Sequence, residues 1–359
     1  MTDTQKKRFT TDFTLQEPIG EEGIPKAVAL LKSGKLHRYH VEPGDKALGN
    51  AYTLTPVPGA VENSGATIEL VDIVDDYTIA RDDLEEKAKA SDIRWFMRSP
   101  MRGHIANMDR VMEICAAHGL VLIEDCAHTM GAAWDGKKSG SFGTAACFST
   151  QTYKQMNSGE GGLLVTDDPE LIARAISYSG SCMLYERHTS RPGMEGFEGI
   201  KTMVPNFSSR MGNLRAAILS PPLNVLDAQG ERGNKRYRIP DQGLNEIDGI
   251  ACPRRDPREN NVGSSIQFSL IGQAETTIEE FLAECLKRGV ELKWLGNKEP
   301  VGFTSAYESW RYFNSLPDLA NTNRILAVMC DMRIPLTFTL DDCRLILEII
   351  RDVSAKILK

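Results

Sequence analysis

The middle of the chain alternates short apolar runs with longer, more polar segments. Apolar runs of this length, bounded by turn residues, are typical of strands that are buried on both faces of a parallel sheet. They are too short to cross a membrane as helices. Strands are therefore predicted at residues 66–73, 95–97, 120–123, 145–148 and 163–166.

Several intervening segments carry apolar residues at helical spacing. Before Gly119, the residues Val111, Met112 and Cys115 mark one buried helical face, Asp109 is the expected N-cap, and Gly119 is the expected stop. Other helices are predicted at residues 21–33, 169–177, 277–287 and 343–358. Strands that alternate with helices indicate an α/β fold around a parallel sheet.

The C-terminal part of the chain has a different pattern, because two predicted strands, 263–271 and 290–295, flank a single helix. At 359 residues, the chain is long enough for about two domains. We predict a large domain at residues 1–225 and a smaller α+β domain at residues 226–359.

The composition is that of an ordinary globular protein, with 41% hydrophobic and 25% charged residues. A net charge of −7 gives no electrostatic reason to expect nucleic acid or an anionic membrane as a partner. The N-terminal segment lacks the apolar core of a signal peptide, so the expected location is cytoplasmic.

The eight cysteines are scattered without a C-x-x-C pair. Cys115, Cys126 and Cys147 lie in apolar patterns and are expected to be buried, reduced thiols. The six histidines show no metal-binding spacing, so no metal site is predicted.

The stretch from residue 120 to 162 carries the candidate chemistry. Asp125 follows a predicted buried strand, and ligands of open α/β sheets collect at such strand ends. Ser149 ends the next strand, and Lys154 follows five residues later. Pyridoxal phosphate needs a lysine for its Schiff base, an acid for its pyridine nitrogen, and hydroxyl or N–H donors for its phosphate. Each of these residues alone is more often a surface or helix-capping residue. The hypothesis of a pyridoxal phosphate site therefore rests on all three occurring in this order.

That set resembles the DegT/DnrJ/StrS sugar aminotransferases, which are fold type I enzymes of the aspartate aminotransferase superfamily. The resemblance lies in Glu124-Asp125-Cys126-Ala127-His128, Phe148-Ser149, Lys154 and Gly159-Glu160-Gly161-Gly162, at the family's spacing. It implies a three-layer αβα fold with a smaller C-terminal α+β domain. It also implies a pyridoxal 5'-phosphate-dependent transaminase, in which Lys154 forms the Schiff base and Asp125 stabilises the pyridinium.

The resemblance implies roles for further residues. Ser149 would contact the cofactor phosphate, and His128 stands where the family usually has Gln. A histidine there can donate to the cofactor's ring oxygen but introduces a titrating group. Tyr52 aligns with an aromatic residue that lies against the pyridine ring, or else it is a core aromatic. Asn206 aligns with a residue that reaches a neighbouring subunit's cofactor phosphate, so a homodimer is expected.

The expected substrates are an amino acid donor and a keto sugar, which we expect to be nucleotide-linked. Arg102 and His104 lie on a loop that the family often places near substrate, and they are either substrate contacts or plain loop residues. Relatives that act as dehydratases replace the lysine by histidine, so Lys154 favours transamination.

The N-terminal part departs from the family pattern. Residues 41–62 resemble the family's second strand and following helix, but only residues 37–44 join them to the first helix. The usual first strand and its phosphate-binding Gly-Ser/Thr turn are missing, so the sheet is expected to lose an edge strand. In addition, Pro221-Pro222, Gly230 and Gly233 are expected to break the family's long helix.

These departures keep a second hypothesis open, in which the protein binds pyridoxal phosphate without turnover. A dinucleotide-dependent oxidoreductase is a third and weaker interpretation, because no G-x-G-x-x-G follows a predicted strand.

Overall fold

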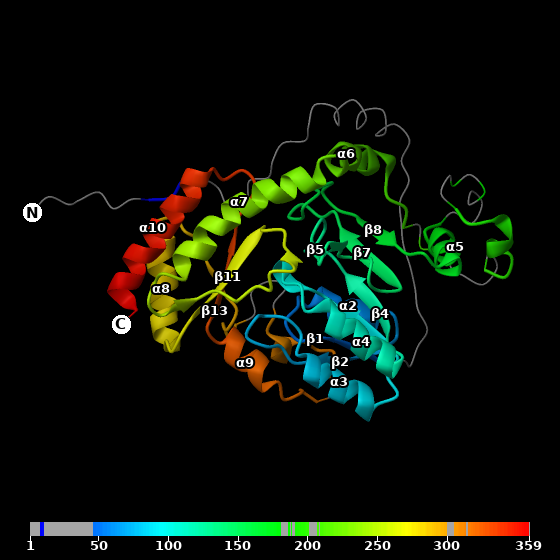
Figure 1. Ribbon diagram of the computed structural model, residues 1–359, viewed down its shortest axis with the longest axis horizontal. Helices are drawn as coiled ribbons and strands as arrows, with labels where there is room; N and C mark the ends of the chain where they lie inside the picture. Colours follow the sequence, from blue (N-terminus) through cyan, green and yellow to red (C-terminus); the bar gives the residue numbers. More distant parts are fainter. Residues whose placement is uncertain are drawn as a thin grey trace, which may run out of the picture.

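The computed structural model describes residues 8–10, 46–180, 186, 188, 191–200, 207, 209–299, 305–313 and 315–358. In these ranges a mainly parallel sheet forms one half of the molecule and an antiparallel sheet the other, each with its own helices (Figure 1). The helix predicted at 21–33, the loop at 37–44 and Asn206 lie outside the described residues.

The larger sheet has the strand order β2-β1-β3-β4-β7-β8. All neighbouring strands are parallel except β8, which pairs with β7 in the antiparallel direction. The strands are β1 (Lys46–Asn50), β2 (Thr67–Val71), β3 (Trp95–Arg98), β4 (Val121–Asp125), β7 (Ala145–Ser149) and β8 (Gly162–Val165). The strands predicted in this half are confirmed.

Helices and loops cover both faces of this sheet, because successive side chains of each strand point to opposite faces. On β1, Leu48 packs with α3 (Arg81–Ala90) and α4 (Met108–His118). Its neighbour Ala47 packs on the other face with α2 (Pro56–Asn63) and with Tyr307, Trp310 and Leu319. The predicted three-layer αβα architecture is confirmed.

The cap of α4 differs from the predicted one. The side chain of Asn107, not Asp109, accepts a hydrogen bond from the N–H of Arg110 and caps the helix. Asp109 lies in the first turn, where its carboxylate accepts from Trp134 Nε1 at 3.2 Å and pairs with Arg258. Gly119 ends the helix in the left-handed conformation at φ 64°, as predicted.

Replacing Asn107 by alanine removes the N-cap acceptor, and we expect it to lower the free energy of unfolding by about 1 kcal/mol. Denaturation by urea measures the change. Asn107→Asp keeps an acceptor at the same position and should retain the wild-type midpoint. Equal losses in both variants would show that the cap does not stabilise α4.

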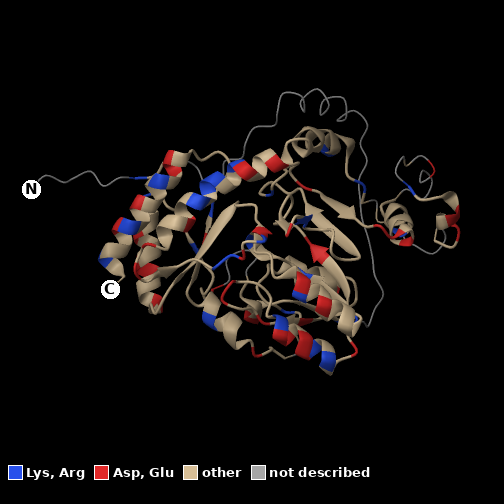
Figure 2. Cartoon of the chain, viewed as in Figure 1, with Lys and Arg blue, Asp and Glu red and all other residues tan. Residues whose placement is uncertain are grey.

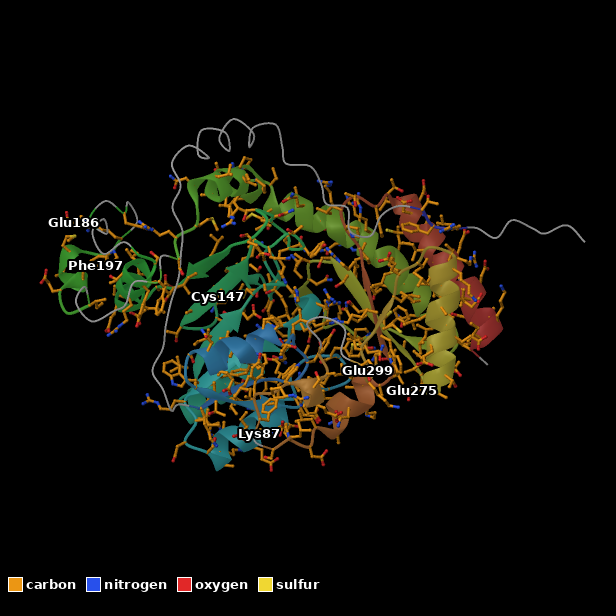
Figure 3. The ribbon with its side chains drawn as sticks, turned by 180° about the vertical axis from the view of Figure 1, so that it is seen from behind. Lys87, Cys147, Glu186, Phe197, Glu275 and Glu299 are labelled. Atoms are coloured by element: carbon orange, nitrogen blue, oxygen red, sulfur yellow. The ribbon has the colours of Figure 1, made fainter. Side chains whose placement is uncertain are left out.

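Strand β8 is an edge of the sheet within the described residues, since β7 is its one neighbour there. Its apolar side chains are partly open to solvent, with Leu163 36% and Val165 48% exposed. Cys147 on β7 is also exposed (Figure 3), so the prediction that it is buried was wrong. Cys115 and Cys126 are buried as predicted. The loss of an edge strand stays a prediction, because residues 11–45 lie outside the described residues.

The second half is built on a four-stranded antiparallel sheet in the order β12-β13-β11-β9. Helices α7, α8 and α10 pack on it, and Figure 1 shows α8 beside α10. The elements are α7 (Leu226–Leu244), β9 (Ile250–Ala251), β11 (Ser265–Leu270), α8 (Glu275–Lys287), β12 (Lys293–Trp294), β13 (Met329–Arg333) and α10 (Leu340–Ile357). The strands and helices predicted in this half are confirmed.

The predicted helix break is only partly correct. Helix α6 (Asn213–Leu223) ends directly after the Pro221-Pro222 pair, and α7 begins at Leu226. The two glycines, however, lie inside α7. A Cβ atom on Gly233 would lie 3.3 Å from the carbonyl oxygen of Gly263, so the glycine lets α7 approach the neighbouring chain closely. Glycine costs a helix about 1 kcal/mol, which tertiary packing offsets.

The remaining elements lie between the two halves or at the periphery of the molecule. They are η1 (Met101–Gly103), β5 (Ala133–Trp134), β6 (Lys137–Lys138), α5 (Pro169–Tyr178), η3 (Met194–Phe197), β10 (Glu259–Asn260), η4 (Tyr307–Ser309) and α9 (Ala320–Leu326). Strand β10 pairs with β5, and the first turn of α9 donates N–H groups to Asp72 near β2. The C-terminal part of the chain thus crosses back to the larger sheet, and the domain boundary at residue 225 stays a prediction.

Charged side chains of both signs are interspersed along α7, α8 and α10 in the view of Figure 2. None of the described helices is long and apolar enough to span a bilayer.

Candidate active site

Asp125 is held at the carboxyl edge of the larger sheet, where β4 ends. Its Oδ2 accepts a hydrogen bond of 2.7 Å from Ser99 Oγ, and its Oδ1 accepts one of 3.1 Å from the N–H of Ala127. Ser99 is itself fixed, because its N–H donates to Asn50 Oδ1 and its Oγ accepts from Thr53 Oγ1. These bonds orient the carboxylate toward a defined position.

Lys154 lies on the loop that follows β7, one strand away from Asp125 in the sheet. Burial lowers the pKa of its ammonium group to about 8. The negative charge of Asp125 raises this pKa, whereas the positive charges of Arg102 and Arg333 lower it further. Within the described ranges, the Lys154 ammonium has no hydrogen-bond or ion-pair partner. A neutral amine is therefore available near physiological pH.

The glycine cluster supports this loop. The N–H of Thr150 donates to the carbonyl of Gly161 at 2.9 Å, and Ser158 Oγ donates to Thr150 Oγ1 at 2.9 Å. Gly161 has a φ of 149°, and a Cβ atom there would lie 2.7 Å from Thr150 Oγ1. Ser149 Oγ accepts from the N–H of Gln151 at 3.3 Å and so helps to shape the turn before Lys154.

His128 is half-buried near Lys154, and its imidazole is held in the neutral form. Its Nδ1 accepts a hydrogen bond of 3.1 Å from the N–H of Arg102, so the neutral ring carries its hydrogen on Nε2. Burial and then the charge of Lys154 hold its pKa well below the ordinary value. The lowered pKa favours the neutral imidazole, and the titration of His128 beside a bound cofactor stays a prediction.

Tyr52 is packed in the core, with a side chain that is 1% exposed and in a cluster that includes Met101, Leu295 and Met329. Its hydroxyl group is buried without a hydrogen-bond partner among the described residues. This position agrees with the core-aromatic interpretation. Contact of Tyr52 with a pyridine ring stays a prediction, as does the role of Asn206.

The two candidate loop residues have different surroundings. His104 is buried and its Nε2 lies 2.6 Å from Gln267 Oε1, so it joins the two halves of the molecule. Arg102 lies near Lys154 with a φ of 57°, and its Nη2 donates to Asp331 Oδ2 at 2.6 Å. Of the two residues, Arg102 is the one that faces the candidate site.

A buried ion pair lies at the end of β4, next to Asp125. Arg98 Nη1 and Glu124 Oε2 lie 3.4 Å apart, and both side chains are almost fully buried. Glu124 Oε1 also accepts from the N–H groups of Phe142 and Gly143, at 2.8 and 2.9 Å. The pair therefore links the end of β4 to the segment that leads into β7.

Some residues of the site were missed by sequence reasoning. Ser99 and Asn50 hold the Asp125 network, and their position at strand ends is the signal that could have found them. Arg333 and Asp331 come from β13 in the other half of the molecule, and no local pattern marks them. In the ranges that the structure describes, no group of His, Cys, Asp and Glu side chains could hold a metal ion.

The charges around Lys154 predict a shift in its titration. Asp125→Asn removes the negative charge that favours the ammonium form, so we expect the pKa of Lys154 to fall further below about 8. Arg102→Gln removes a repelling positive charge and should raise this pKa. The rate of Lys154 acetylation by acetic anhydride, mapped by mass against pH, measures both shifts. A common midpoint in the wild type and both variants would contradict this electrostatic account.

Curated proteins resemble this chain over part of its length. The chain is 33% identical over 188 residues to GDP-perosamine synthase of Caulobacter vibrioides, covering 52% of this chain and 47% of that protein. It is 30% identical over 220 residues to dTDP-3-amino-3,4,6-trideoxy-alpha-D-glucose transaminase of Streptomyces venezuelae, covering 60% and 54%. Alignments with the first curated relatives span 47 to 65% of their lengths.

The fold is also found among solved structures. The aminotransferase TlmJ from Streptoalloteichus hindustanus superimposes with a TM-score of 0.79 at 17% identity, covering 96% of this chain and 99% of that one. Residues 29–351 match the DegT/DnrJ/EryC1/StrS aminotransferase family. The chain belongs to this family.

Proposed function

We propose that this protein is a pyridoxal 5'-phosphate-dependent aminotransferase that moves an amino group from an amino acid to a nucleotide-linked keto sugar. The observation that carries the proposal is the placement of Asp125 and Lys154 at the same edge of the sheet, with the pKa of Lys154 lowered to about 8.

The residues present fit this cofactor. The unpartnered amine of Lys154 is suited to hold it, and the oriented Asp125 carboxylate is suited to hold a proton on a pyridine nitrogen. The Nε2–H of His128 is suited to donate to a ring oxygen, and Ser149 to contact the phosphate. When bound, pyridoxal phosphate supplies an electron sink for proton removal beside the amino group.

The chain's own residues would then move the proton. A lysine whose pKa is about 8 changes its protonation state near neutral pH, so it can take a proton from one carbon and return it to another. The neutral His128 keeps its hydrogen on Nε2 throughout. The Asp125 carboxylate would hold a proton on the pyridine nitrogen of the bound cofactor.

The proposed sugar substrate rests on the relatives. GDP-perosamine synthase and the dTDP-amino-sugar transaminase are named for amino sugars that carry a nucleotide. A homodimer, in which Asn206 serves the partner's cofactor, is part of the proposal and follows from the family resemblance. The alternative, cofactor binding without turnover, would use the same neutral amine of Lys154, so a product assay has to separate the two functions.

The proposal is tested by incubating the protein with pyridoxal phosphate, a set of L-amino acids and a nucleotide-linked keto hexose. We expect a keto acid to form from one donor and the nucleotide sugar to gain an amine, both detected by mass spectrometry. A folded protein that takes up the cofactor but yields neither product would favour binding without turnover.

A further inference from the structure

Arg102 holds a backbone conformation that its residue type rarely adopts. Its φ is 57° and its ψ is 17°, which places it in the left-handed region. For a residue with a Cβ atom this conformation is disfavoured about 5- to 30-fold relative to the right-handed one. Contacts elsewhere in the protein must therefore hold Arg102 in place, and backbone strain of this kind is concentrated at functional sites.

The strained backbone lies against His128. The N–H of Arg102 donates to His128 Nδ1 at 3.1 Å. A Cβ atom on Gly103 would lie 3.4 Å from the carbonyl oxygen of His128, so the two segments run close together. Because Nδ1 accepts, the neutral ring carries its hydrogen on Nε2. The backbone of Arg102 thus selects one tautomer and one orientation of the imidazole.

Two side chains fasten the loop of residues 102–104 to the antiparallel sheet. Arg102 Nη2 donates to Asp331 Oδ2 at 2.6 Å, and the Asp331 side chain is only 3% exposed. His104 Nε2 lies 2.6 Å from Gln267 Oε1. A single residue separates the two attached positions, so the strained part of the loop is held on both sides by the other half of the molecule.

The two anchors also contact each other. Gln267 on β11 and Asp331 on β13 stand opposite one another in the strand register. Gln267 Nε2 donates to Asp331 Oδ1 at 2.7 Å and to Ser265 Oγ at 3.0 Å. The amide oxygen of Gln267 is then left to accept from the Nε2–H of His104. The donors and acceptors of this buried cluster therefore fit together in one arrangement.

We propose that Asp331 and Gln267 are positioning residues for His128, and that they act through the backbone of Arg102. The direction of a backbone N–H depends on the backbone angles of its residue, and the left-handed geometry brings the N–H of Arg102 to Nδ1. The inference rests on the proposed aminotransferase function, in which the Nε2–H of His128 donates to the ring oxygen of the cofactor. The antiparallel sheet thereby controls a hydrogen-bond donor that the larger sheet carries.

The test follows the imidazole of His128 by NMR in the full chain, labelled with ¹⁵N-histidine and free of cofactor. His128→Gln assigns the signals of this ring. The wild type should show an N–H at Nε2 and an acceptor nitrogen at Nδ1. In Arg102→Ala and Asp331→Ala, the share of the tautomer with its hydrogen on Nδ1 should rise about 2- to 10-fold, the effect of losing one hydrogen bond.

Arg102→Gly is the matched variant, because it loses the same charge and the same side-chain bond as Arg102→Ala. Glycine adopts a positive φ without strain, so its N–H can still reach Nδ1. The tautomer ratio should therefore stay closer to that of the wild type in Arg102→Gly than in Arg102→Ala. Arg324→Ala breaks an exposed arginine–aspartate pair with Asp75 and should leave the His128 signals unchanged.

The same His128 tautomer in the wild type, Arg102→Ala and Asp331→Ala overturns the inference. An equal change in Arg102→Ala and Arg102→Gly overturns it as well, because the backbone angle would then have no effect. If Asp331→Ala fails to fold by circular dichroism, Asp331→Asn, which has one acceptor oxygen in place of two, replaces it in the comparison.

Pyridoxal phosphate is then titrated into each protein. Variants with the mixed tautomer should bind it about 2- to 10-fold more weakly than the wild type, since the donor to the ring oxygen is no longer fixed. Equal affinities would overturn the positioning role. A wild type that has the single tautomer but binds no pyridoxal phosphate would refute the proposed function, while the tautomer ratios would still decide whether Asp331 and Arg102 fix His128.

Discussion

Lys154→Ala should abolish aminotransfer, with the rate of keto acid formation falling at least about 10²- to 10⁴-fold. This is the range expected when a positioned proton-transfer group is removed. In this protein the same amine is also proposed to hold the cofactor, so the loss combines two effects. The rate of amino acid deamination in a single turnover, followed by the absorbance of the bound cofactor, measures it.

Two controls test whether the loss of activity is specific to the amine of Lys154. Lys298→Ala removes an exposed lysine that pairs with Glu275 and should retain the wild-type rate. Adding methylamine to Lys154→Ala supplies an amine in solution and should restore part of the activity, because the remaining pocket is unchanged. Full activity in Lys154→Ala would exclude the proposed role of this residue.

The second large effect is on stability. Arg98→Met leaves the carboxylate of Glu124 buried without its guanidinium partner. Removing one member of a buried ion pair typically costs about 3–5 kcal/mol. We expect a loss of this size in the free energy of unfolding, measured with guanidinium chloride at an unchanged m value.

Two further variants test whether the loss of stability comes from the unpaired buried charge of Glu124. Arg98→Met combined with Glu124→Gln removes both charges and should recover part of the loss, since the glutamine can still accept from the N–H groups of Phe142 and Gly143. Arg351→Ala breaks an exposed pair with Glu246 and should cost less than about 1 kcal/mol. A similar small loss in Arg98→Met would contradict the structural role of the buried pair.

The strands of the larger sheet, and the candidate residues Asp125 and Lys154, could be predicted because the sequence patterns that mark them are local. A buried strand is an apolar run, and its last residue marks the ligand edge of the sheet. Asp125 ends one such run, and Lys154 follows the end of the next one by five residues. The order of the motif then identified the family, and with it the three-layer fold.

The features that sequence reasoning missed depend on contacts between distant segments. Gly233 stays inside α7 because the chain at Gly263 packs against it. His128 stays neutral because burial and the charge of Lys154 oppose protonation. Arg333 reaches the site only because the antiparallel sheet is placed against the larger one. None of these effects follows from the neighbours of a residue in the sequence.

The most direct test of the account is to mix the purified protein with pyridoxal phosphate, reduce it with borohydride and map the modified peptide by mass. The account predicts a single pyridoxyl group on Lys154, which is absent from Lys154→Ala and present in Lys298→Ala. A folded protein without this adduct, or with the pyridoxyl group only on other lysines, would contradict the claim that Lys154 and Asp125 form a cofactor site.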